Sequence, residues 1–326
     1  MSMRARLLLV NTAILAVAVT AELGLSQAPN ERDWEKVAGG KMAFEVASVR
    51  LNPGPLEPSN FRLSPDDAYA NTGGLLNADS QLGHYIEFAF KIQPTREQWE
   101  TMYAHLPKWV TTVNYEIHAR APVQNPTKDQ MRLMMQSLLK ERFGLAVHYE
   151  TRDTPVFEMS LVKPGKLGPK LRRHEKGPPC SITAPPGAGI LGTPAPGGAA
   201  LKGPDVYPAT CGGVEARFEP HQMMLMGARD TTMEMIASSL QIGRLGRSVV
   251  DQTGLTGKYD FTLNWAPEPG TFRTGPDAPP QEAPASDPQG PTFMQAVGDQ
   301  LGLKLKPGKA PLKVLVVDHV ERPSEN

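Results

Sequence analysis

The chain has 326 residues, and its 34 Lys and Arg residues balance its 34 Asp and Glu residues, so the formal net charge is zero. A neutral chain has no overall field that attracts nucleic acid or an acidic membrane surface, so we expect no nucleic acid partner. Hydrophobic residues make up 40% of the chain, which is enough for one large or two small domains. The 32 prolines are about twice the usual share, and their clustering indicates linkers and loops.

The first 21 residues have the pattern of a signal peptide. Arg4 and Arg6 precede a mostly apolar run over 7–19, and the small residues before and at Ala21 suit cleavage there. This run is short for a membrane span, although an uncleaved anchor is the alternative. We therefore expect an exported protein, periplasmic or extracellular, with no transmembrane span beyond the signal segment.

Export changes the interpretation of the only two cysteines, Cys180 and Cys211. Both lie in a stretch rich in Pro and Gly, and an oxidising compartment favours a disulfide between them. Two free thiols are the alternative. A zinc site is disfavoured because neither cysteine has a second one at the spacing of a C-x-x-C motif.

Residues 41–163 are predicted to form a first α+β unit. Its strongest element is a helix over 127–144, with Thr127 as N-cap, Gly144 as C-cap and an apolar stripe that includes Met131 and Phe143. The other expected elements are strands over 44–50 and 73–80, a helix over 81–90, and strands over 113–121, 145–152 and 155–163.

Residues 164–213 are predicted to be a Pro/Gly-rich linker, because they have too few large apolar groups to offset the chain entropy lost on folding. A G-x-G-x-x-G pattern occurs there at Gly187, Gly189 and Gly192. A dinucleotide site needs a strand before this pattern and a helix after it, and neither is predicted. We therefore predict no cofactor from this stretch.

Residues 214–326 are predicted to form a second α+β unit that contains a disordered loop over 266–290. The expected elements are a strand over 224–230, a helix over 231–246, a strand over 257–265, a helix over 291–302, and strands over 303–310 and 311–321. This order repeats that of the first unit. We therefore predict an internally duplicated α+β fold of helix-strand-helix-strand-strand units, with antiparallel sheets and helices on one face.

The last strand contains an apolar run, Val314-Leu315-Val316-Val317. Because successive side chains of a strand point to opposite faces, the run predicts a strand buried on both faces and located inside its sheet. In the second unit, a methionine group is interpreted as core, with an adaptable apolar binding surface as the alternative. It consists of Met223, Met224, Met226, Met233 and Met235.

Searches for catalytic motifs find no H-E-x-x-H helix and no G-x-S-x-G elbow. One constellation could bind a metal ion: Glu116 and His118 share one face of a strand, and His148 and Glu150 share one face of another. Should the two strands be neighbours, the four side chains would converge as zinc ligands. The alternative is a solvated sheet face that carries scattered charges.

Several segments resemble the Soli family of uncharacterised exported proteins from Acidobacteria. The resemblance is carried by FEVASVR, LPKWVTTVNYEIHARAP, VVDQTGLTGKYDFTLNW and VVDHVERPSEN. It covers most of the chain after the signal segment, apart from the Pro-rich stretches. It implies a domain of unknown function, related to domains fused behind membrane metallopeptidases of the β-lactam-sensor type, and it implies no catalytic residues.

These features favour a non-catalytic binding or interaction module of the cell envelope, whose partner is an unknown envelope protein or peptide. Such a partner can add to the open edge of a sheet. The alternative is an envelope hydrolase with an unrecognised site, for which a metal-dependent centre at Glu116, His118, His148 and Glu150 is one candidate. A structural periplasmic protein is a third possibility.

Overall fold

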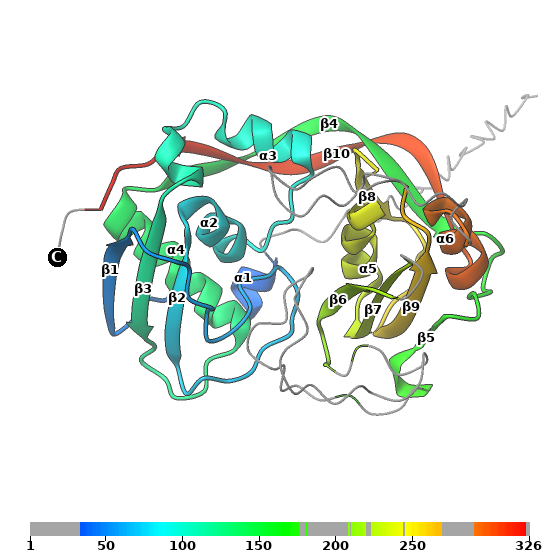
Figure 1. The fold of residues 1–326 in the computed structure, drawn as a ribbon, viewed down its shortest axis with the longest axis horizontal. Coiled ribbons are helices and arrows are strands. Elements are labelled where there is room, and N and C mark those ends of the chain that lie inside the picture. The colour runs from blue at the N-terminus through cyan, green and yellow to red at the C-terminus, as the bar shows by residue number, and fades with distance from the viewer. Residues whose placement is uncertain are drawn as a thin grey trace, which may run out of the picture.

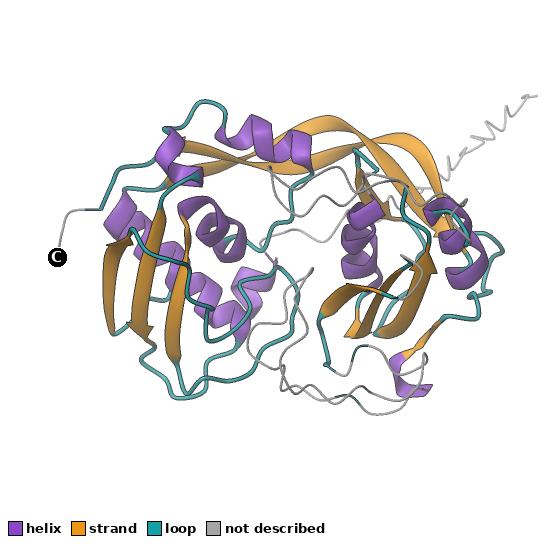
Figure 2. Cartoon of the chain, viewed as in Figure 1, coloured by secondary structure: helices purple, strands orange, loops and turns teal. Residues whose placement is uncertain are grey.

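The computed structural model describes residues 33–176, 180, 208, 210–219, 223–243, 245–268 and 290–323. The predicted signal peptide at 1–21, the glycine pattern at 187–192 and most of the predicted loop at 266–290 lie outside these residues. Helices and strands are both abundant among the described residues, and the α+β class is confirmed (Figure 2).

The first half of the chain forms one three-stranded antiparallel sheet, in the order β1-β3-β2, together with four helices. Its elements are α1 (Asp33–Val37), β1 (Val46–Asn52), β2 (Leu75–Gln81), α2 (Leu82–Ala89), α3 (Arg96–Tyr103), a 3-10 turn (Lys108–Thr111), β3 (Asn114–Arg120), α4 (Lys128–Phe143) and β4 (Ala146–Leu161). The helix α3 and the 3-10 turn were not predicted from the sequence.

The caps of α4 are those that the sequence predicts. The Thr127 hydroxyl accepts a hydrogen bond from the backbone N–H of Gln130, and the Gln130 side chain accepts one from the backbone N–H of Thr127. Such a capping box satisfies two backbone donors at the helix start. At the other end Gly144 has φ of 57°, in the left-handed region that glycine adopts without strain.

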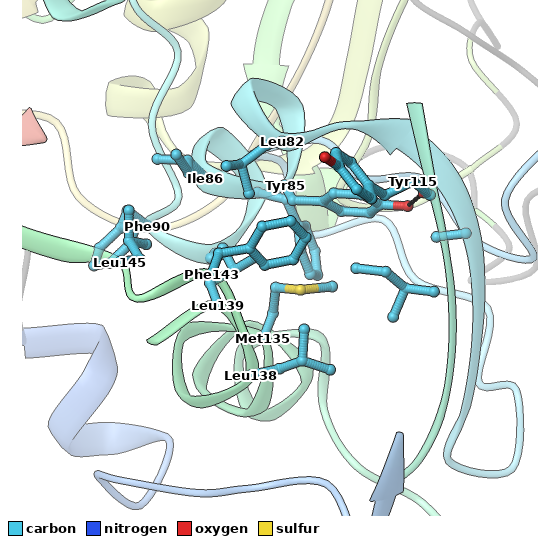
Figure 3. Packing of buried hydrophobic residues seen from close by; sticks show 14 of the residues in the cluster. Leu82, Tyr85, Ile86, Phe90, Tyr115, Met135, Leu138, Leu139, Phe143 and Leu145 are labelled. Atoms are coloured by element: carbon cyan, nitrogen blue, oxygen red, sulfur yellow. Dashed lines mark hydrogen bonds between the residues drawn. The ribbon is translucent and has the colours of Figure 1, made fainter. Parts of the chain in front are cut away.

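The predicted apolar stripe of α4 packs into the core of the first half. Met135, Leu139 and Phe143 are fully buried and face the apolar side of α2 (Figure 3). In this core the Tyr85 hydroxyl donates a hydrogen bond to the backbone oxygen of Tyr115 at 2.7 Å. The core therefore joins α2 and α4 to one face of the β1-β3-β2 sheet.

The second half forms a four-stranded sheet in the order β5-β9-β7-β6. Its elements are β5 (Leu171–Arg173), a 3-10 turn (His174–Lys176), β6 (Val214–Phe218), β7 (Met224–Thr231), α5 (Met233–Ser239), a 3-10 turn (Leu240–Gly243), β8 (Ser248–Asp251), β9 (Tyr259–Trp265), α6 (Phe293–Leu301) and β10 (Leu303–His319). Because β5 pairs with β9, the start of the predicted linker belongs to this sheet.

The prediction of two separate strands at the end of each half is wrong, because the structure has one continuous strand in place of each predicted pair. Pro155 lies inside β4 and Pro311 inside β10, and these two long strands pair with each other in antiparallel fashion. The neighbour on the other side of β4 is β8, which pairs only with residues 156–159. Pro155 lies just outside that pairing, and among the described residues β10 pairs with β4 alone, so no strand on the outer side of either proline needs its missing N–H.

The position predicted for the last strand is also wrong. The third sheet has the order β10-β4-β8, so β10 is an edge strand and β4 the central one. Leu315 and Val317 are buried, whereas Val314 and Val316 are only partly buried, so one face of the strand carries most of the packing. The pairing of β4 with β8 is parallel, whereas only antiparallel pairing was expected.

The β4–β10 ribbon crosses both halves of the molecule and contributes to both cores (Figure 1). Leu315, Val317 and Val320, which lie in or just after β10, belong to the core of the first half. Met159, from the distal part of β4, belongs to the core of the second half. Each half is therefore completed by residues that the other half supplies.

The order β2-α2-β3-α4-β4 has a counterpart in β7-α5-β9-α6-β10. Aligning the helix-ending glycines Gly144 and Gly302 makes Asp153 equivalent to Pro311, and these two residues face each other in the β4–β10 register. When two equivalent strands pair in antiparallel fashion around a two-fold axis, equivalent residues face each other at the centre of the pairing. We propose an internal duplication from this match.

Candidate functional site

Two adjoining cavities lie where the halves meet. The larger has a volume of about 530 Å³ and is lined from both halves, and the smaller, of about 390 Å³, is lined by the first half alone. Both are bordered by Pro65, Gln93, Pro94 and Arg96. We call the two cavities together the junction cleft.

The segment that separates the two cavities is held firmly at the start of α3. Thr95 caps this helix, accepting from the backbone N–H of Gln98 at 3.2 Å, while its own N–H donates to the Gln98 side chain at 2.9 Å. The second half contacts the same segment: Gln241 donates to the backbone oxygen of Gln93 at 3.4 Å, and the Ser248 hydroxyl to Gln98 Oε1 at 3.3 Å. This wall therefore depends on both halves.

The second half supplies an apolar wall to the larger cavity. Met226 of β7 is fully buried, Met235 comes from α5, and Ile242 comes from the following 3-10 turn. Methionine side chains are flexible and polarizable, so they adapt to ligands of different shape. Met226 and Met235 of the predicted methionine group thus line the cavity, and Met226 also belongs to the core together with Met224 and Met233.

Two arginines border the larger cavity, one from each half. The Arg96 side chain is 88% exposed and donates to Glu100 at 2.8 Å, and the Arg247 guanidinium lies 5.7 Å from the centre of the Phe157 ring. Apolar walls beside positive charge suit a ligand with an apolar body and an anionic group.

The smaller cavity contains a carboxyl group in an unusual state. Glu87 of α2 lines it together with His84 and Trp99, and its Oε1 atom is buried with no hydrogen-bond partner. Burial raises the pKa of Glu87 to about 7, although a hydrogen bond from Trp99 opposes the shift. The group therefore carries a proton in about half of the molecules near neutral pH and can donate or accept a hydrogen bond.

The serine hydroxyls in the cleft are not arranged for nucleophilic catalysis. Ser64 donates to Asp66 Oδ1 at 2.7 Å, and Ser239 donates to the backbone oxygen of Ile236 at 2.7 Å. An activated serine needs a base within hydrogen-bond reach that takes up its proton. Ser64 has a buried carboxylate already occupied by Lys128, and Ser239 has only a carbonyl.

A buried ionic group, which we call the junction cluster, consists of Asp66, Lys128 and Arg132. Lys128 Nζ lies 2.9 Å from Asp66 Oδ1, and both side chains are only 4% exposed. Arg132 is fully buried and donates to the backbone oxygens of Ser64 at 2.9 Å and Asp66 at 2.7 Å. Burial alone would raise the pKa of Asp66, but the charges of Lys128 and Arg62 lower it overall.

The junction cluster also ties the first half to the second. The backbone N–H of Val214 donates to Asp66 Oδ2 at 3.4 Å, Arg62 donates to the backbone oxygen of Val214 at 3.2 Å, and the N–H of Asp67 donates to the oxygen of Gly212 at 3.0 Å. Next to Gly212, Cys211 forms a disulfide with Cys180. These contacts therefore hold the two halves together beside the junction cleft.

The predicted metal ligands are not brought together. His118 Nε2 lies 2.5 Å from Glu116 Oε1 on β3, and His148 Nε2 lies 3.1 Å from Glu150 Oε1 on β4. The hypothesis required neighbouring strands, but β3 pairs only with β1 and β2, whereas β4 belongs to a different sheet. Across the described ranges, no group of three or more His, Cys, Asp or Glu residues could hold a metal ion.

Sequence reasoning missed Glu87, Arg96 and Arg247. A weak signal existed for Glu87, which is the single acidic residue in an otherwise apolar helix segment, YIEFAF. The two arginines lie in segments without a distinguishing pattern, and they meet only because the halves pack together.

The fold and the cleft describe an α+β protein of two interlocked halves with a ligand-sized cavity between them. The model of a family of proteins of unknown function, DUF3738, matches residues 83–320, and the chain belongs to this family. No curated protein and no solved structure is significantly similar to the chain. Of the helices within the described ranges, none is both long and apolar enough to cross a bilayer.

Proposed function

We propose that this chain is a non-catalytic binding protein of the cell envelope and that the junction cleft holds its ligand. The observation that carries the proposal is the larger cavity, of about 530 Å³, whose walls combine methionine side chains with one arginine from each half. Its volume lies within the usual range for small-molecule sites. A ligand with an apolar body and an anionic group fits this lining best.

Export is part of the same proposal. The sequence at 1–21 supports it, and so does the Cys180–Cys211 disulfide, because disulfides persist mainly in oxidising compartments. The resemblance to the Soli family implies an acidobacterial origin and relatives that are fused to membrane metallopeptidases. Both implications are part of the proposal. The hydrolase alternative gains no support from the four candidate ligands, because the two His/Glu pairs lie in separate sheets.

The binding proposal is tested with 8-anilinonaphthalene-1-sulfonate, a fluorescent probe that joins aromatic rings to an anionic group. We expect saturable binding of one probe per chain. Met235→Trp fills the cavity and should weaken binding at least tenfold, and Arg247→Gln should weaken it by about threefold to tenfold. Met294→Trp is the matched control, because Met294 is 45% exposed on α6 and should leave affinity unchanged.

If Met235→Trp and the control Met294→Trp changed the affinity for the probe equally, the junction cleft would not be the binding site.

Export is tested separately by expressing the full chain in a bacterial host and sequencing the N-terminus of the product. We expect the product in the periplasm or medium, beginning at Glu22. Recovery of the chain in the cytoplasm, with its N-terminus intact, would contradict export.

A further inference from the structure

A β-bulge interrupts the second half's sheet at the end of β7. The register between β7 and β9 shifts between Ala228 and Thr231, and Asp230 has φ of 52°. Bulges of this kind redirect side chains and are common beside functional sites. Here the bulge places Arg229 next to Asp260 of β9, on the opposite face of β7 from Met226 and the junction cleft.

The Arg229 guanidinium is buried without its hydrogen bonds. The side chain is 2% exposed, and neither Nε nor Nη2 has a hydrogen-bond partner. A buried donor normally has a partner, because an unmet one costs the full desolvation of the group. Nε and Nη2 form the side edge of the guanidinium, where two N–H groups point in the same direction.

Asp260 does not close this edge. Its Oδ2 atom lies 3.8 Å from Arg229 Nε, which is beyond hydrogen-bond distance. The carboxylate is held in place through Oδ1, which accepts from the backbone N–H of Asp230 at 3.0 Å and lies 2.6 Å from His174 Nδ1. The side edge of Arg229 therefore has no hydrogen-bonded partner among the described residues, and the residue lines a small space inside the protein.

That space is a small pocket with a volume of about 30 Å³, separate in its lining from the junction cleft. Lys170, Arg172 and Arg229 bring three positive charges to its lining, and Asp260 brings one negative charge. A pocket of this size admits a water molecule or the end of a ligand, but not a large group.

We propose that this pocket is a second binding site, which takes the carboxylate of a ligand on the side edge of Arg229. The two oxygens of a carboxylate match the two N–H groups of such an edge and form a bidentate pair. Burial also lowers the pKa of Arg229, and the charge of Asp260 opposes this shift without cancelling it, while Arg172 adds a smaller like-charge repulsion. An incoming carboxylate would place a second negative charge beside Arg229.

Acetate is the probe, titrated into the full chain with sodium chloride adjusted to keep the ionic strength constant. We expect saturable binding by calorimetry and a rise in Tm of about 2 °C at an acetate concentration about five times Kd. Arg229→Gln should weaken acetate binding at least tenfold. Arg217→Gln, on the neighbouring strand β6 with a side chain 50% exposed, is the control and should bind as the wild type does.

A second variant keeps the test decisive should Arg229→Gln fold poorly. Asp260→Asn removes the one carboxylate that the described residues bring to the pocket lining, so acetate should bind several-fold more tightly. No saturable acetate effect in the wild type would mean that water alone fills the pocket and would overturn the proposal. Equal affinity in Arg229→Gln and wild type, or weaker binding in Asp260→Asn, would overturn it as well.

Discussion

Each half of the molecule buries an arginine, and the two guanidinium groups have different surroundings. Both Nη atoms of Arg132 in α4 donate hydrogen bonds, to Asp129 and to two backbone oxygens, and only its Nε lacks a partner. Arg229 in β7 is almost as buried, yet two of its nitrogens lack partners. The first arrangement is that of a structural cross-link, and the second is that of a site that a ligand completes.

The largest effect is expected from Arg132→Met, which removes the donor to the Ser64 backbone oxygen. Among the described residues it also removes one of two donors each to Asp129 and to the Asp66 backbone oxygen. Breaking a buried ionic group from one side typically costs about 3–5 kcal/mol, and we expect a loss of that size in the free energy of unfolding. Urea denaturation measures it. Lys140→Met, at an exposed position of the same helix, is the control and should change stability by less than about 0.5 kcal/mol.

An intermediate effect is expected at Glu87, whose Oε1 atom is buried without a hydrogen-bond partner. Its pKa rises from 4.5 to about 7 in the folded chain, so between these pH values the unfolded chain loses the proton while the folded chain keeps it. The raised pKa of Glu87 therefore contributes favourably to the free energy of unfolding below pH 4.5, and this contribution is lost as the pH rises through 7. The loss has an upper bound of about 3 kcal/mol.

Glu87→Gln should therefore match the wild type in stability at pH 4.5 and exceed it by about 1–3 kcal/mol at pH 8. Denaturation at the two pH values measures the difference. Glu97→Gln, at an exposed position of α3, should show no such divergence with pH. A stability gain for Glu87→Gln that is the same at both pH values would contradict the assigned burial of its charge.

The smallest effect is expected from Arg229→Gln in the absence of carboxylate. The substitution removes no hydrogen bond of Nε or Nη2, and Asp260 keeps its contacts with His174 and Asp230. We expect a change in the free energy of unfolding below about 1 kcal/mol, measured by the same urea denaturation. A loss as large as that of Arg132→Met would show that both arginines are structural, and the contrast between them would disappear.

Local sequence patterns predicted the local structure well. Thr127 and Gly144 cap α4 as predicted, because caps depend on a few neighbouring residues. The structure shows the same pair of residue types at the ends of α6, at Thr292 and Gly302. Pro155 was misleading, because a proline interrupts a strand only where a ladder partner needs its missing N–H. Whether a partner needs the N–H of Pro155 depends on where β8 ends, and β8 lies far from Pro155 in the sequence.

The functional candidates could not be predicted in the same way, since they depend on which distant segments meet. The distance between His118 and His148 follows from the strand order of two separate sheets. Arg229 carried a faint signal, as a charged residue directly after the apolar run MLMGA, but its unmet hydrogen bonds follow from a bulge and from the partners of Asp260.

The exchange of strands between the halves has a consequence for how this chain folds during synthesis. The first half emerges from the ribosome before the second, but its core includes Leu315, Val317 and Val320. Those side chains become available only when nearly all of the 326 residues have been translated. An N-terminal half whose core lacks these side chains cannot complete its packing until the last strand has been made.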